Sequence, residues 1–197
     1  MITRNICLAT IAILTLSANL LVAQTGYAVK SAKMTVSGTS TLHPWESNVT
    51  KVMADGKISI ADGALQQISS LTVTVPARSI KSEHGKMMDD KTYDALKADA
   101  NPNITFQLVS VDAIEKSGSG YTVKAKGNLT IAGVKKLVSM TVTSTVAANG
   151  NVTFKGSKLI NTKEFGMETV KALMGTVKVG DEVTINFEVT LGPASAS

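Results

Sequence analysis

Strand-like alternation recurs along most of this chain and constrains its fold more than any other feature. About eight segments of this kind follow one another, and short turn signals such as Asn149-Gly150 separate them. In the last segment every second residue is apolar and the residues between are polar, with the apolar set being Val183, Ile185, Phe187, Val189 and Leu191. One face of each strand is therefore expected to be buried and the other solvated. This pattern predicts an all-β, antiparallel protein, either an up-and-down barrel or a sandwich.

Details of the alternation predict where the strands turn or bulge. Ile104, Phe106 and Leu108 share a face, and Val111 joins that face only if a bulge follows Leu108. Asp55-Gly56 is a typical two-residue turn, so we expect it to connect two strands.

Residues 79–106 interrupt the alternation. Met88, Thr92, Ala95 and Leu96 recur at helical spacing, and Pro102 requires the helix to end before it. We expect one short amphipathic helix from about residue 86 to 97. Its apolar face needs a surface to cover, so it should form a lid or side wall of the barrel.

The N-terminal segment is typical of export. Arg4 precedes an apolar run over residues 6–22, and the small residues around Ala28 suit a cleavage site after it. We therefore expect a signal peptide at 1–28, a single domain at 29–191 and a flexible tail at 192–197, in a periplasmic or, alternatively, secreted protein. The other interpretation is an uncleaved membrane anchor. Cleavage after Ala28 would remove Cys7, the chain's only cysteine.

Charge and side-chain chemistry favour binding over catalysis. The formal net charge is +5, but the basic residues are scattered, which argues against nucleic acid as the main partner. Mild basicity could assist a transient contact with a membrane surface. The two histidines, His43 and His84, have no metal-ligand spacing, and no serine lies in a nucleophile elbow. We expect no metal, no cofactor and no enzymatic activity.

Several motifs, in the same order, resemble the YceI-like family. They are Thr39-Ser-Thr-Leu-His-Pro-Trp-Glu46, Ile80-Lys-Ser82, Met87-Met-Asp89 with Tyr93 and Ala95-Leu-Lys97, Asn101-Pro-Asn-Ile-Thr-Phe106, Gly127-Asn-Leu-Thr-Ile-Ala-Gly-Val134 and Gly180-Asp-Glu-Val-Thr-Ile185. The resemblance implies a lipocalin-like antiparallel barrel of about eight strands. It also implies that a long apolar channel holds a polyisoprenoid or similar lipid, usually in the periplasm.

The candidate ligand-binding residues are large apolar or amphipathic side chains at inward-facing, helical or loop positions. They are Leu42, Trp45, Met87, Met88, Tyr93, Leu96, Phe106, Leu129, Met140, Phe165, Met167, Met174 and Phe187. Some of them have an ordinary structural role as the alternative: Trp45 as a plug of the core or the barrel rim, and Met87 and Met88 as the buried face of the helix. Residues 163–174 could form a second flap or a core crossover. Four lysines near turns could meet a pyrophosphate or be simply solvated, namely Lys81, Lys86, Lys135 and Lys136.

Two functions follow from this pattern. The first is a periplasmic carrier that encloses an isoprenoid, an isoprenoid quinone or a fatty-acyl chain. The alternative is a secreted stress or interaction protein whose barrel is filled by its own side chains. An elongated empty cavity would favour the carrier.

Overall fold

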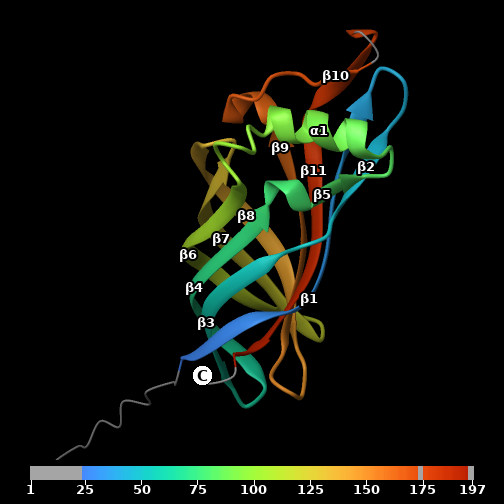
Figure 1. Ribbon diagram of the computed structural model, residues 1–197. Coiled ribbons are helices and arrows are strands. Elements are labelled where there is room, and N and C mark those ends of the chain that lie inside the picture. The colour runs from blue at the N-terminus through green and yellow to red at the C-terminus, as the bar shows by residue number, and fades with distance from the viewer. Residues whose placement is uncertain (1–23, 173–174, 195–197) are drawn as a thin grey trace, which may run out of the picture.

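Eight antiparallel strands close into a barrel in the computed structural model, which describes residues 24–172 and 175–194 (Figure 1). Around the ring they are β1 (Thr25–Ser40), β3 (Met53–Ala61), β4 (Ala64–Pro76), β6 (Asn103–Ser117), β7 (Gly120–Ile131), β8 (Val134–Val146), β9 (Val152–Asn161) and β11 (Val177–Pro193). Pairing of β11 with β1 closes the ring. The predicted barrel is confirmed, and the sandwich is not observed.

The remaining elements gather at one end of the barrel. They are β2 (Trp45–Val49), η1 (Ala77–Ser79), β5 (Ile80–Ser82), α1 (Lys86–Ala95), η2 (Thr162–Phe165) and β10 (Lys171–Ala172). Figure 1 shows α1 lying across this end, so the predicted helix is confirmed in place and in type. Among the described residues, no helix is long and apolar enough to cross a membrane.

The bulge predicted from the alternation is present, but the predicted turn is not. The pairing of β6 with β7 shifts register between Leu108 and Ser110, which confirms the expected bulge. The turn expected at Asp55-Gly56 was wrong, because both residues pair with β4 in the middle of β3. The neighbouring strand approaches closely there: a Cβ atom on Gly56 would lie 3.0 Å from the carbonyl oxygen of Ser70. Glycine is present for this close approach and not for a turn.

The end of the barrel opposite α1 is packed solid. Ile58, Val152 and Leu191 are almost fully buried there. Tyr27 joins them at 3 % exposure, and its hydroxyl donates a hydrogen bond of 2.9 Å to the carbonyl of Gly150. An internal ligand therefore has no room at this end.

Both expected domain boundaries fall inside paired strands. Ala28 lies within β1, which begins at Thr25 and pairs with both β3 and β11. Gly192 and Pro193, expected in the flexible tail, pair with Ala28 and Tyr27. Residues 1–23 of the expected signal peptide lie outside the described residues.

Candidate functional site

A cavity of about 170 Å³, measured as the volume open to the centre of a water molecule, occupies the middle of the barrel. Its lining comes from all eight barrel strands and is apolar except for one lysine, Lys158 of β9. The larger lining side chains include Phe106, Leu129, Met140 and Phe187. This composition follows from the alternation, because every second residue of each strand points inward.

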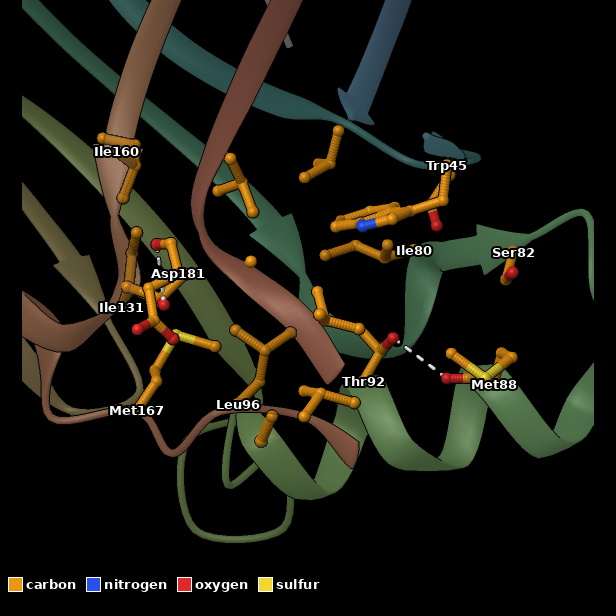
Figure 2. Close-up of a pocket in the computed structure, with 18 of the residues that line it drawn as sticks. Trp45, Ile80, Ser82, Met88, Thr92, Leu96, Ile131, Ile160, Met167 and Asp181 are labelled. Atoms are coloured by element: carbon orange, nitrogen blue, oxygen red, sulfur yellow. Dashed lines mark hydrogen bonds between the residues drawn. The ribbon is translucent and has the colours of Figure 1, made fainter. Parts of the chain in front are cut away.

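A second cavity of about 130 Å³ lies beneath α1. The helix contributes its apolar face, Met88, Thr92, Ala95 and Leu96, as the sequence predicts (Figure 2). The hydroxyl of Thr92 donates to the carbonyl oxygen of Met88 at 3.0 Å, so this hydroxyl needs no partner inside the cavity. The helix is thus a wall of the cavity at the α1 end.

The two cavities adjoin along the barrel. Ile104 and Ile185 line both of them. Together the cavities extend from α1 toward the plug that includes Tyr27. The barrel is therefore not filled by its own side chains.

Three aromatic rings lie against the barrel wall, and each of the three covers a glycine. The ring of Phe187 lies over Gly156, where a Cβ atom would come within 2.8 Å of its Cζ. The ring of Trp45 covers Gly38 in the same way, at 2.8 Å from Cζ2. A Cβ atom on Gly127 would overlap the ring of Phe106. Glycines at inward-facing strand positions are the sequence signal from which these ring positions could have been predicted.

An ion pair attaches α1 to the barrel. Asp89, only 7 % exposed, accepts a hydrogen bond of 2.7 Å from the backbone N–H of Ser82 and lies 3.2 Å from the ammonium of Lys81. Lys81 also donates to the hydroxyl of Tyr93 at 2.7 Å, and that hydroxyl donates to the carbonyl of Ile80 at 3.0 Å. These contacts join the helix to β5.

The charges in this attachment alter two pKa values. Burial raises the pKa of Asp89, but the hydrogen bond from Ser82 and the pairing with Lys81 outweigh burial and hold this pKa below its ordinary value of 3.8. Hydrogen bonds to Tyr93 and Asp89 raise the pKa of Lys81. Both groups are therefore charged at neutral pH.

The opening beside α1 carries acidic groups. Glu168 and Asp181 line the upper cavity together with Met167, and Figure 2 labels Met167 and Asp181. Asp181 accepts a hydrogen bond of 2.8 Å from Thr169 and lies 3.6 Å from the ammonium of Lys163.

The structure brings together most, but not all, of the candidate residues. Trp45, Met88, Leu96 and Met167 line the upper cavity, and Phe106, Leu129, Met140 and Phe187 line the lower one. Tyr93 and Phe165 are buried but line neither cavity, since Tyr93 anchors the helix and Phe165 packs in the core. Leu42 and Met87 are 66 % and 59 % exposed and line neither. Met174 lies outside the described residues.

The polar candidates are also separated. Lys81 and Lys86 pair with Asp89 and Asp90, whereas Lys135 and Lys136 lie on β8. The rings of His43 and His84 are 5.3 Å apart. Within residues 24–172 and 175–194, however, no group of three or more His, Cys, Asp or Glu side chains is placed to hold a metal ion. Sequence reasoning missed Lys158, although it occupies an inward position of β9 between Gly156 and Ile160.

Comparison with known proteins agrees with this architecture. The family profile of the YceI-like domain matches residues 27–191. BcnA of Burkholderia cenocepacia is 28 % identical, with a TM-score of 0.58 over 81 % of this chain and 95 % of its own. A polyisoprenoid binding domain from Saccharophagus degradans, implicated in plant cell wall breakdown, is 11 % identical, with a TM-score of 0.67 over 86 % of this chain and 99 % of its own. A YceI protein of Campylobacter jejuni is 22 % identical, with a TM-score of 0.56 over 76 % and 85 %. Comparison with curated protein sequences finds no match.

Proposed function

The chain belongs to the YceI-like family, and from this premise we propose that it binds one long apolar lipid chain inside its barrel. The observation that carries the proposal is the pair of adjoining apolar cavities between α1 and the packed end of the barrel. A polyisoprenoid, an isoprenoid quinone and a fatty-acyl chain all match such a space, because each offers a flexible chain with no polar groups along it.

Burial of the chain would supply most of the affinity. Each buried CH₂ contributes about 0.8 kcal/mol, so a chain needs few polar contacts to be held. The methionines also support binding of a lipid chain, because a flexible thioether adapts to chains of different shape. Met88, Met140 and Met167 all line the cavities. The alternative of a self-filled barrel would need these cavities to be occupied by side chains.

The proposed setting is the periplasm, where the protein would carry or store its lipid. The apolar run over residues 6–22, after Arg4, supports export. We also propose that the protein binds and does not catalyse, since the cavity lining offers apolar contact and few reactive groups.

Two adjacent methionines provide a matched test. Met88 faces the upper cavity, whereas Met87 is 59 % exposed and outside it. Binding of the neutral probe geranylgeraniol is measured by the fluorescence of Trp45, the only tryptophan, which lines the same cavity. Met88→Ala should lose roughly 1 kcal/mol of chain contact, about a fivefold weaker Kd, and Met87→Ala less than twofold. Absence of binding by the unsubstituted protein would refute the function. Equal effects of the two variants would refute the role of the α1 face.

A further inference from the structure

The wall of the barrel is interrupted between β8 and β9. These strands pair only where Thr143–Val146 meets Val152–Lys155. Residues 134–142 of β8 and 156–161 of β9 do not pair with each other, although β8 pairs with β7 over residues 134–144 and β9 pairs with β11 along its whole length. The lower cavity reaches this interruption, because Met140 and Lys158, one from each strand, line it.

The usual polarity of the barrel is inverted at two places beside this interruption. Lys158 pairs with Ile185, and Lys136 pairs with Leu129. Because paired residues share a face of the sheet, both lysines lie on the interior face, where the other strands place apolar residues. On the exterior face, Leu137 is 62 % exposed and Leu159 is 57 % exposed.

The ammonium of Lys158 is positioned for an additional acceptor. It donates one hydrogen bond of 3.1 Å across the interruption, to the carbonyl oxygen of Ser139. An ammonium has three N–H donors, so two remain for a ligand. Among the residues that line the lower cavity, Lys158 is the only charged one.

The upper cavity and the β8–β9 interruption in the side wall differ in the charges they carry. The upper cavity is lined by the carboxylates of Glu168 and Asp181, and Asp181 already pairs with Lys163, so the charges there do not attract an anion. The β8–β9 interruption carries Lys158 and Lys136. An apolar chain with an anionic end would therefore place that end at the interruption, while its tail lies among the apolar residues of the barrel.

We propose that Lys158 binds the oxyanion of a single-chain anionic amphiphile whose tail occupies the barrel. The shared chemistry is a carboxylate or a phosphate on one long hydrocarbon chain. This proposal rests on the proposed function, because it assigns a head-group site to the same lipid cavity.

The test compares charged and neutral ligands of equal chain length. One arm uses palmitate and hexadecanol, and the other uses geranylgeranyl phosphate and geranylgeraniol, with Kd measured by titration for each. Lys158→Gln should weaken palmitate or geranylgeranyl phosphate about tenfold and leave both alcohols unchanged, since a charged hydrogen bond is lost. The arm with the larger loss identifies carboxylate or phosphate as the preferred head group. Lys158→Arg should retain most of the anion affinity.

Lys155→Gln is the matched control. Lys155 lies three residues before Lys158 on β9, where it pairs with Glu188 at 3.3 Å, and its side chain is 70 % exposed. This substitution should leave all four ligands unaffected. Equal weakening of acid and alcohol by Lys158→Gln, or no weakening of either anion, would overturn the head-group site while alcohol binding still supports the lipid cavity. Failure of the unsubstituted protein to bind any of the four ligands would overturn both proposals.

Discussion

Gly156→Ala is expected to push the ring of Phe187 into the lumen. Lipid binding should then weaken although the protein still folds. A Cβ atom at this position would lie 2.8 Å from Cζ of Phe187 and 2.9 Å from Cγ1 of Val142. The end of the ring must therefore move by about 0.6 Å to reach 3.4 Å, where ordinary contact begins. Both neighbouring atoms are ends of side chains, so the strands themselves need not shift.

The two consequences have different magnitudes. Overpacking costs roughly 1–3 kcal/mol, and replacing glycine returns about 0.4–1 kcal/mol by restricting the unfolded chain. A net loss near 1 kcal/mol corresponds to a Tm lower by about 2–4 °C for a domain of this size. The displaced ring should also remove contact worth about one CH₂ of the lipid, roughly 0.8 kcal/mol, which is about fourfold in Kd.

A double-mutant cycle identifies the ring as the cause. Tm by calorimetry and Kd for geranylgeraniol are measured for Gly156→Ala, Phe187→Leu and the double variant. The smaller leucine should restore part of the affinity lost in Gly156→Ala, giving a coupling between the two sites. Additive effects, or an unchanged Kd in Gly156→Ala, would refute the idea that glycine keeps the ring against the wall.

Two further predictions concern the lid and the N-terminus. Asp89→Asn should destabilise the protein by roughly 1–2 kcal/mol at pH 7, whereas Asp90→Asn, in an exposed pair, should cost less than about 0.5 kcal/mol. Because folding lowers the pKa of Asp89, this stabilisation is present above pH 3.8 and lost as the pH falls through the folded value, so unfolding curves of the unsubstituted protein and Asp89→Asn should converge in acid. An equal loss of stability from the two substitutions at pH 7 would contradict the role of Asp89 in attaching α1 to β5. Mass spectrometry of the exported protein should find an N-terminus that retains Tyr27, because Tyr27 is buried and paired; a mature chain starting at Val29 would contradict this.

The inward faces of the strands could be predicted because alternation of period two leaves little choice. The bulge after Leu108 followed from the same rule, since Val111 reaches the interior only with one extra residue. The helix followed from its different period. For adjacent helical residues the prediction was weaker: Met87 and Met88 are about 100° apart around α1, and only Met88 faces the cavity.

Other features depended on contacts that local sequence does not encode. Gly26-Tyr27-Ala28 suits a cleavage site, yet the same residues pair with β3 and β11 at the two sides of the barrel seam. Asp55-Gly56 suits a turn, but the close approach of Ser70 places it within a strand. Residues 192 and 193 gain order only by pairing with β1. The interruption between β8 and β9 depends on how the strands diverge in space, so Lys158 could not be assigned to it from sequence.

The central claim is that the barrel encloses one lipid chain. Native mass spectrometry of the full chain, expressed with export and purified without detergent, tests this claim directly. The account predicts a species heavier than the protein by the mass of one single-chain lipid, which organic extraction removes and added geranylgeraniol or palmitate replaces with one molecule per protein. A lipid-free protein that takes up neither ligand in excess would contradict it.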